Sequence, residues 1–522
     1  MRRFALALAC IVGITSVPAH SQIQTAKVTG GEVQGTVNGG IAAFKGIPFA
    51  APAGGENRWR APQPVQPWTG VKKADKFAPG CVQDANMIRM FGGDTNFSED
   101  CLHLNVWTPA KSAREKLPVM VWIYGGAFIG GQTGLPLYDG TRLAEKGVVL
   151  VSVAYRVGPF GFLAHPELTK ESGGKGSGNY GLLDQIAGLK WVRENIAKFG
   201  GDPKRVTIFG ESAGGIAVSM LAASPLAKGL FAQAISESGG NFAPPKYGNE
   251  GGQTGPPLEL AERMGQRFLG SLGAADLKAA REVPAEKIHA AAGLGVGMFW
   301  PVFDGYVLPG DQYVLYQAGR FNDTPILIGT NSDEGALFTR QAVTSAAFAK
   351  LVRDGYGTQA DTILAAYPHT TDAEAFKSMK NLFRESAFAW HTWVWARLHA
   401  QKSRNKVFMY YFDHRTPRSP DGADHGSEIA FVFRNQRTPM GGPTPEDVAL
   451  SEMISSYWVN FAKTGDPNGA GLPSWPAFTE SAQQLMTFDK NPSARPVPNL
   501  EQLQAFDKYY AWRREQLKGD AN

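Results

Sequence analysis

The stretch that decides the fold runs from Val206 to Gly215 and reads VTIFGESAGG. Four strand-forming residues at its start predict a buried strand, and the small residues that follow predict a sharp turn into a helix. A Gly-x-Ser-x-Gly turn exposes the serine hydroxyl, and its glycines leave room for the strained backbone. The bare pattern would occur by chance in about one of three chains this rich in glycine. Its place between a strand and the helical run 214–223 therefore makes Ser212 a candidate nucleophile.

Strands and helices alternate outward from this turn. Apolar segments that predict buried strands are 118–124, 148–155, 325–329 and 407–412. Residues 181–199 carry apolar side chains at helical spacing, and 501–517 are predicted to form an amphipathic closing helix. This alternation predicts an α/β architecture with a large, mostly parallel central sheet flanked by helices. Because neither a repeat nor a linker interrupts the pattern, we expect one domain over residues 22–522.

The N-terminus has the pattern of an export signal. Arg2 and Arg3 precede an apolar run over 4–17, and small residues follow at 17–19. This pattern predicts a signal peptide over residues 1–21, with cleavage near 19–21. The apolar run is shorter than the roughly 20 residues that a membrane span needs. We therefore expect export to the periplasm or the medium, without stable insertion in a membrane.

The mature chain would be weakly charged and would keep two cysteines. Removing the signal peptide takes away two arginines and no acid, so the formal net charge falls from +5 to +3. The charges are dispersed, which argues against nucleic acid as a partner. In an oxidising compartment Cys81 and Cys101 are expected to form a disulfide rather than two free thiols. The sequence makes no prediction of an oligomeric state.

Acyl transfer at a serine needs a base, an acid that orients the base, and N–H donors for the oxyanion. The strand 118–124 leads into Gly125-Gly126-Ala127-Phe128, which is similar to the glycine-rich oxyanion loops that follow such strands. The backbone N–H groups of Gly126 and Ala127 would then join that of Ala213 in an oxyanion hole with three donors.

The acid is expected between the nucleophile and the histidine, because chains with this serine turn place the triad in that order. The strand 325–329 is followed by Asp333 and Glu334. Sites in open α/β sheets assemble at the carboxyl ends of strands, so either acid fits on spacing alone.

The base must then be a histidine that follows this acid. His425 lies in a loop downstream of the strand 407–412, before the apolar run 429–433, and suits the role. His391 and His399 lie in an aromatic helical run where packing explains them better, and His414 ends a strand.

Several motifs together resemble the type-B carboxylesterase and cholinesterase family over about residues 35–478, with bacterial para-nitrobenzyl-esterase-like carboxylesterases as the nearest type. They are EDCLHLNVW at 99–107, the Gly125 loop, the turn at 210–215, DEG at 333–335 and FAKTGDP at 461–467. The resemblance implies the α/β-hydrolase fold, Glu334 as the acid and His425 as the base. It also implies the Cys81–Cys101 disulfide, and Glu211, Ser238 and Glu428 as supporting groups around the base. Ala127 departs from the family pattern, in which many members have a third glycine, and its methyl should narrow the approach to the oxyanion hole.

The function implied is that of a secreted serine carboxylesterase. It would hydrolyse small neutral esters through an acyl-enzyme on Ser212 and would require neither a metal nor an organic cofactor. Two alternatives stay open. The same fold serves in adhesion ectodomains that have lost the serine or the histidine, but here every triad position is filled. It also serves in lipases, which would need a large exposed apolar lid.

The substrate class is predicted from two loops. Residues 82–100 contain Met87, Met90, Phe91 and Phe97 but no tryptophan, which cholinesterases use to bind a quaternary ammonium through its ring face. The segment 293–300 reads GLGVGMFW, with glycines where cholinesterases carry bulky aromatic residues. We expect neutral, aromatic or bulky esters as substrates and poor activity on choline esters. The alternative is that Phe97 or Trp300 rebuilds both subsites.

Overall fold

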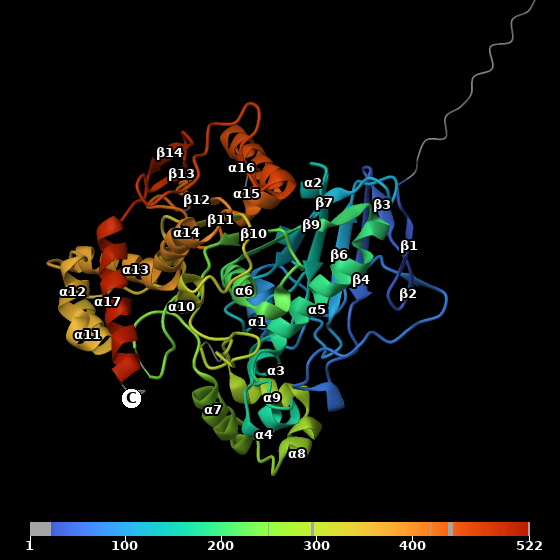
Figure 1. The fold of residues 1–522 in the computed structure, drawn as a ribbon, viewed down its shortest axis with the longest axis horizontal. Helices are drawn as coiled ribbons and strands as arrows, with labels where there is room; N and C mark the ends of the chain where they lie inside the picture. The colour runs from blue at the N-terminus through green and yellow to red at the C-terminus, as the bar shows by residue number, and fades with distance from the viewer. Residues whose placement is uncertain (1–21, 249, 294–296, 418, 437–441, 520–522) are drawn as a thin grey trace, which may run out of the picture.

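The computed structural model describes residues 22–248, 250–293, 297–417, 419–436 and 442–519 (Figure 1). The predicted signal peptide, residues 1–21, lies outside the described residues. Within them, no helix has the length and apolar character that crossing a membrane requires.

A large sheet of eleven strands forms the centre of the molecule. From edge to edge its strands are β14 (Ser493–Pro496), β13 (Gln484–Phe488), β12 (Val407–Phe412), β11 (Ile326–Asn331), β10 (Gln233–Glu237), β9 (Gly201–Glu211), β7 (Leu117–Ile123), β8 (Val149–Val153), β6 (His103–Thr108), β4 (Ile41–Pro48) and β3 (Thr36–Asn38). From β13 to β8 the neighbours are parallel, and the pairs towards both edges are antiparallel. A second sheet holds β1 (Thr25–Val28), β2 (Gly31–Gln34) and β5 (Val71–Lys73).

The central strands are apolar along their whole length because helices cover both faces of the sheet. All residues of β8 and β11 are buried, and so are all of β7 after its first residue. The predicted strand 407–412 coincides with β12, and the other three predicted strands match β7, β8 and β11 within two residues. β9 is longer than the predicted 206–209, because Gly201 at its start already pairs with Leu117 of β7.

Helices of the first half of the chain cover the sheet or cap its ends. They are α1 (Ala85–Met90), α2 (Thr141–Ala144), α3 (Gly158–Phe162), α4 (Pro166–Glu171), α5 (Tyr180–Asn195) and α6 (Ala213–Ala223). The chain between β10 and β11 adds α7 (Leu258–Ser271), α8 (Leu277–Glu282), α9 (Ala285–Ala292) and α10 (Gln312–Gln317). In Figure 1, α7, α8 and α9 gather with α3 and α4 at the lower end of the molecule.

The second half of the chain contributes the remaining helices. Between β11 and β12 lie α11 (Ser345–Tyr356), α12 (Ala360–Ala365), α13 (Asp372–Arg384), a π-helical turn η7 (Glu385–Ala389) and α14 (Trp390–Lys402). They are followed by α15 (Ile429–Phe433), α16 (Pro445–Thr464) and α17 (Leu500–Gly519). The predicted closing helix 501–517 is confirmed as α17, which packs on α12 and α14.

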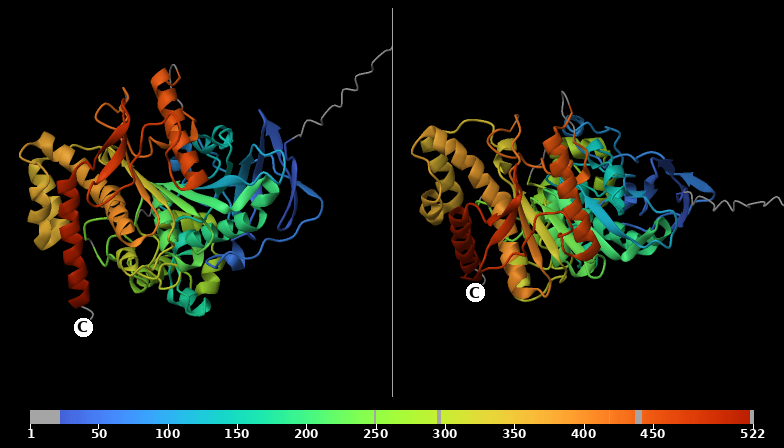
Figure 2. Two further views of the ribbon diagram at one scale, coloured as in Figure 1. Left: turned by 45° about the horizontal axis from the view of Figure 1, so that its top comes forward. Right: turned by 90° about the horizontal axis from the view of Figure 1, so that it is seen from above.

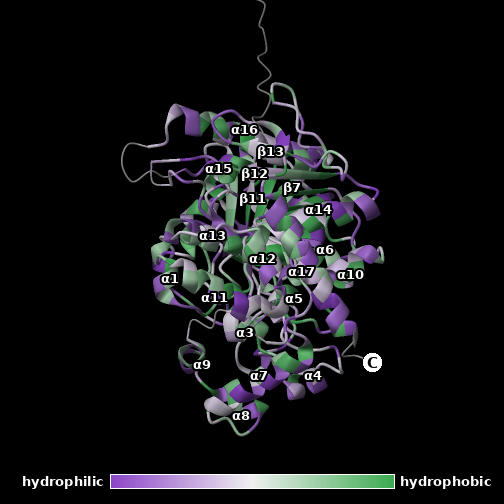
Figure 3. Cartoon of the chain, turned by 90° about the vertical axis from the view of Figure 1, so that its left-hand side faces the viewer, coloured by the Kyte–Doolittle hydropathy of each residue, from purple (hydrophilic) through white to green (hydrophobic). Residues whose placement is uncertain are grey.

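The two faces of the sheet carry different helices, as alternate residues of β10 show. The Ser236 hydroxyl donates to the carbonyl of Gly215 in α6, 3.0 Å away. Its neighbour Glu237 accepts a hydrogen bond from Trp458 of α16, at 2.7 Å. Successive strand residues point to opposite faces, so α6 and α16 lie on opposite sides of the sheet. In the right-hand view of Figure 2, which looks down on the molecule, the orange helix α16 lies in front of the sheet. Figure 3 shows hydrophobic colour on the central strands and mixed colour on the outer helices.

Candidate active site

The turn between β9 and α6 holds Ser212 in a strained conformation. Ser212 has φ 55° and ψ −124°, a region that residues with a side chain rarely adopt. Its N–H donates to the carbonyl of Glu237 at 2.9 Å, which ties the turn to β10. A Cβ at Gly210 or Gly214 would overlap the carbonyl oxygen of Ile123, so both positions require glycine. The strand, the turn and the helix predicted around Ser212 are therefore all present.

Glu334 follows β11 directly and lies fully buried. Its Oε1 accepts hydrogen bonds from the Ser238 hydroxyl at 2.6 Å and from the N–H of Asn331 at 2.7 Å. Its Oε2 lies 2.5 Å from Nδ1 of His425. Asp333 turns away and pairs with Lys380 at 2.9 Å. Of the two acids that fit on spacing, the structure places Glu334 against the histidine.

The imidazole of His425 packs against two phenylalanine rings, and its side chain is 7% exposed. The ring of Phe388 stacks on it, with centroids 4.6 Å apart and an interplanar angle of 17°. Phe338 lies at 5.2 Å with a tilt of 58°. Nε2 of His425 lies 3.2 Å from Oε1 of Glu211, the residue that precedes Ser212. This contact is an ion-pair distance without hydrogen-bond geometry, so Nε2 keeps its hydrogen-bonding capacity.

The carboxylates around His425 change its acidity and their own. Burial lowers the pKa of His425, but the charges of Glu211 and Glu334 outweigh it and raise that pKa to about 9. Burial raises the pKa of Glu211 to about 7, with Glu334 adding to the effect. Burial, Glu211 and Glu334 raise the pKa of Glu428 to about 8. The charges of His425, Glu211 and Glu428 therefore depend on one another near neutral pH.

The predicted oxyanion loop lies beside Ser212. Gly126, Ala127 and Phe128 have φ 111°, 53° and 59°, so three successive residues have positive φ. The loop is closed by the N–H groups of Ile129 and Gly130, which donate to the carbonyl of Gly126 at 3.0 and 3.2 Å. A Cβ on Gly125 would come within 3.0 Å of the Ser212 Cβ, which shows how closely the loop approaches Ser212.

A cavity of about 610 Å³ opens onto Ser212. Its apolar lining comes from the predicted oxyanion loop, α6, α7, α13, η7 and the segments before and after β11, and comprises Ala127, Ala213, Ile216, Pro256, Leu260, Met264, Trp300, Phe338, Phe383, Ala387 and Phe388. Lys246 is the one charged side chain among the described lining residues. Its Nζ is directed to the carbonyl of Gly252 at 3.4 Å, and burial lowers its pKa. The lining of the cavity is therefore mainly apolar.

Of the two loops used to predict the substrate, residues 82–100 are fully described and 293–300 only partly. Residues 294–296 of the segment 293–300 lie outside the described residues, while Gly297 and Trp300 line the cavity. Trp300 is 5% exposed and packs edge-on against Phe128, with centroids 4.9 Å apart. Phe97 instead packs on Gly80 and is not among the lining residues. Trp300 is thus part of the cavity wall, where it packs against Phe128.

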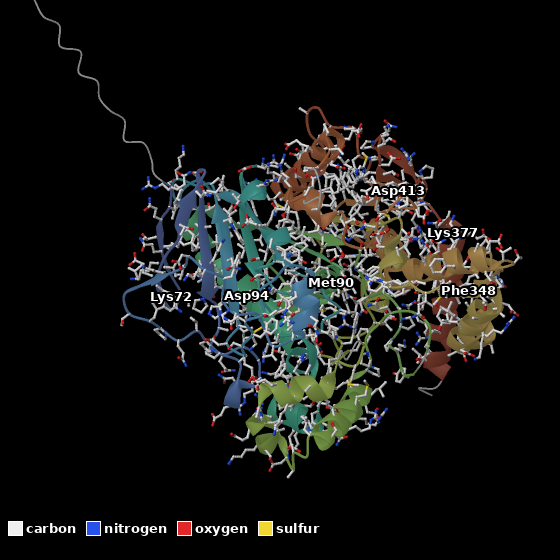
Figure 4. The ribbon with its side chains drawn as sticks, turned by 180° about the vertical axis from the view of Figure 1, so that it is seen from behind. Lys72, Met90, Asp94, Phe348, Lys377 and Asp413 are labelled. Carbon is white, nitrogen blue, oxygen red and sulfur yellow. A yellow bond between two sulfur atoms is a disulfide. The ribbon has the colours of Figure 1, made fainter. Side chains whose placement is uncertain are left out.

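Cys81 and Cys101 form the expected disulfide. The loop between them carries α1, and Met87 of this helix packs on Gly130, next to the oxyanion loop. Met90 on the same helix is 73% exposed and lies on the face shown in Figure 4, as does Asp94. The disulfide thereby attaches one wall of the oxyanion loop to β6.

The other histidines weighed as the base, His391, His399 and His414, have contacts that do not involve Ser212. His391 accepts the N–H of Phe242 on Nδ1 at 3.0 Å, and His414 lies 2.6 Å from Asp447. His399 is fully buried. The sequence did not single out Phe338 and Phe388, whose rings pack on the imidazole of His425. For Phe338, the sequence offered one signal, which is an aromatic residue shortly after Glu334.

A strained serine turn, a buried carboxylate–imidazole pair and a glycine-rich loop on a parallel sheet define the class of serine hydrolases with the α/β-hydrolase fold. Residues 18–506 match the carboxylesterase family. The chain belongs to this family and is a carboxylic ester hydrolase.

Relatives span almost the whole chain. Fumonisin B1 esterase of Sphingopyxis macrogoltabida is 37% identical over 93% of this chain and 90% of its own. Para-nitrobenzyl esterase of Bacillus subtilis (strain 168) is 37% identical over 91% of this chain and 96% of its own. A solved structure of a PNB esterase, 35% identical, superimposes with a TM-score of 0.80 and covers 93% of this chain and 100% of that one. The fold expected from the sequence is thereby confirmed.

Proposed function

We propose that the protein is an exported serine carboxylesterase of one domain, residues 22–522, which hydrolyses neutral carboxylic esters through an acyl-enzyme on Ser212. His425 acts as the base and Glu334 as the acid that orients it. The observation that carries the proposal is the 2.5 Å contact between Glu334 Oε2 and His425 Nδ1, beside a serine held at φ 55°. The contact leaves Nε2 as the nitrogen that can accept a proton.

The mechanism follows from these positions. Nε2 of His425 takes the proton of the Ser212 hydroxyl while Oγ attacks the ester carbonyl carbon. The N–H groups of Gly126, Ala127 and Ala213 hold the resulting oxyanion. When the bond to the alcohol oxygen breaks, His425 gives its proton to the leaving alcohol. Water then attacks the acyl-enzyme, its proton passes to His425, and Ser212 is released with its hydroxyl restored.

Glu211, Ser238 and Glu428 support this pair. Ser238 donates to the oxygen of Glu334 that His425 does not contact. Glu211 lies beside Nε2 and favours the imidazolium that forms during attack. Glu428 accepts a hydrogen bond at 2.5 Å from the side chain of Asn331. Asn331 is the last residue of β11, and its backbone N–H donates to Glu334.

A neutral ester suits the apolar lining of the cavity. A quaternary ammonium would lack a tryptophan in the disulfide loop and would meet Lys246 in the cavity. We therefore expect higher kcat/KM for the uncharged carbon isostere of acetylcholine than for acetylcholine, and good activity on a benzoate ester. A clear preference for acetylcholine would contradict the substrate class.

The decisive experiment labels the protein with a serine-directed phosphonate. Mass spectrometry should place one adduct on Ser212, with loss of esterase activity in proportion to labelling. Ser212→Ala should take up no label. A labelled serine elsewhere, or full activity after labelling, would refute the mechanism. Comparing soluble short-chain esters with emulsified long-chain glycerides separates an esterase from a lipase, and N-terminal sequencing of the mature protein should find a start near residues 20–22.

A further inference from the structure

A row of side chains crosses the sheet beside Ser212. Glu211 of β9 is in register with Glu237 of β10, Glu237 with Gly329 of β11, and Gly329 with Tyr410 of β12. Register partners in parallel strands point to the same face, about 5 Å apart. A Cβ on Gly329 would overlap the ring of Tyr410, so that ring fills the space over β11. Tyr410 therefore extends across β11 towards Glu237.

Polar atoms of this row are buried with part of their hydrogen-bonding capacity free. Glu237 has zero exposure; its Oε1 accepts from Trp458 at 2.7 Å, and its Oε2 has no partner among the described residues. Glu428 is 1% exposed; its Oε2 accepts from Asn331, and its Oε1 likewise has no partner in the described part of the chain. The hydroxyl of Tyr410 is also buried, and it too has no hydrogen-bond partner among the described residues.

Hydrogen-bond chemistry decides what these atoms require. Ionised carboxylates are acceptors only, so neighbouring ones cannot pair with each other. Burying an ionised group without a partner is costly, and two adjacent carboxylates seldom both ionise. The charged groups that act on Glu237 are Glu428 and Glu211, both acids, and burial with these charges raises its pKa well above the usual range. Burial also raises the pKa of Tyr410, so its hydroxyl remains a donor.

We infer that Glu237 carries a proton at the pH at which the enzyme works and, through that proton, donates a hydrogen bond to Glu428. The protonated side chain of Glu237 thereby limits the negative charge beside His425. The inference rests on the proposed triad. His425 already faces the carboxylates of Glu211, Glu334 and Glu428 and the rings of Phe338 and Phe388.

One more negative charge in this cluster would raise the pKa of His425 further above about 9 and leave less of its imidazole neutral. A protonated imidazole cannot accept the proton of Ser212. Glu237 touches neither substrate nor the reacting atoms, and acts through Glu428 as a positioning residue. Its neutral side chain donates one hydrogen bond and accepts the one from Trp458, which satisfies both of its oxygens.

Infrared difference spectroscopy in D₂O tests the proton directly. The spectrum of the wild-type chain minus that of Glu237→Gln should show the carbonyl stretch of a protonated carboxylic acid at about pH 7. Glu286→Gln, at an exposed position of α9, is the matched control and should give no such band. Absence of the band for Glu237→Gln would overturn the inference. If that variant does not fold, Tyr410→Phe is measured instead and should shift the same band. An unshifted band in Tyr410→Phe would then overturn the inference.

The pH profile of kcat/KM on an uncharged soluble ester gives a second reading. Glu237→Gln should leave the midpoint of the acid limb unchanged, because a neutral group replaces a neutral group. Glu428→Gln should lower that midpoint, since the charge of Glu428 raises the pKa of His425. A fall of about one pH unit in Glu237→Gln would show an ionised Glu237 and refute the inference. The infrared band needs no turnover, so failure of the proposed triad would leave it visible.

Discussion

Oε2 of Glu334 lies 2.5 Å from Nδ1 of His425, although 91 residues separate the two in sequence. The other oxygen of Glu334 accepts from Ser238 and from the backbone of Asn331. With both oxygens engaged, the carboxylate holds the Nδ1 edge of the imidazole in place and sets its tautomer. The orientation of the His425 imidazole thus depends on groups from β11, from the end of β10 and from the loop after β12.

The proposed triad predicts a graded loss of turnover. Ser212→Ala and His425→Ala should each lower kcat by about a million-fold, because the residues act as one unit. Glu334→Gln should lower kcat less, because the amide oxygen can still accept the hydrogen bond from Ser238 and the substitution mainly removes the negative charge. Asp333→Asn is the matched control and should stay within about tenfold of wild type, because Asp333 contacts Lys380 instead. A greater loss in Asp333→Asn than in Glu334→Gln would show that the acid is misassigned.

Stability should fall as the pH rises above about 6.5. Folding raises the pKa of Glu211 to about 7 and of Glu428 to about 8, so the folded chain holds protons that the unfolded chain has released. His425, raised to about 9, contributes stability below its unfolded pKa and loses it as the pH passes 9. Folding lowers the pKa of His391 to about 3 and that of His399 to about 4. These two histidines make stability increase with pH, but only below about 6.5, where they offset the decrease caused by Glu211 and Glu428.

Urea unfolding at a series of pH values measures this dependence. The free energy of unfolding should change little from about pH 5 to 6.5 and decrease from about 6.5 to 9. Glu428→Gln removes one of the groups responsible and should make the decrease shallower. A free energy of unfolding that increases over the alkaline range would contradict the assigned directions.

The Cys81–Cys101 disulfide should stabilise the chain by about 3 kcal/mol, the loop-closure value for its separation of 20 residues. Cys81→Ala with Cys101→Ala should lower the free energy of unfolding by that amount. Because Met87 of the closed loop packs on Gly130, the double variant should also lose activity before it unfolds globally. Non-reducing peptide mapping checks the linkage, and two alkylatable thiols in the purified protein would contradict it.

Ala127→Gly should relieve strain in the oxyanion loop. Ala127 has φ 53°, where a side chain costs about 1 kcal/mol or more and glycine costs little. We expect a higher thermal midpoint and a higher kcat/KM for esters with bulky acyl groups, because the methyl no longer narrows the cavity. Ala290→Gly, at an exposed position of α9, should instead destabilise by about 1 kcal/mol. A loss of stability in Ala127→Gly equal to that of the control would show that the loop is unstrained.

The sequence by itself determined the local parts of this protein. An apolar strand, a small-residue turn and a helix around Ser212 are specified by neighbouring residues, and so are the four predicted strands and the closing helix. The disulfide was expected from two cysteines in a chain predicted to be exported. For the acid, the spacing left Asp333 and Glu334 equal, and only the resemblance to a family separated them.

The tertiary structure decided which distant side chains meet. Lys380 of α13 takes Asp333 away from the site, and the π-helical turn places Phe388 on His425. The row from Glu211 through Glu237 to Tyr410 exists because the register of four strands aligns them on one face. Register is set by pairing between segments far apart in the chain, so no local pattern of residues contains it.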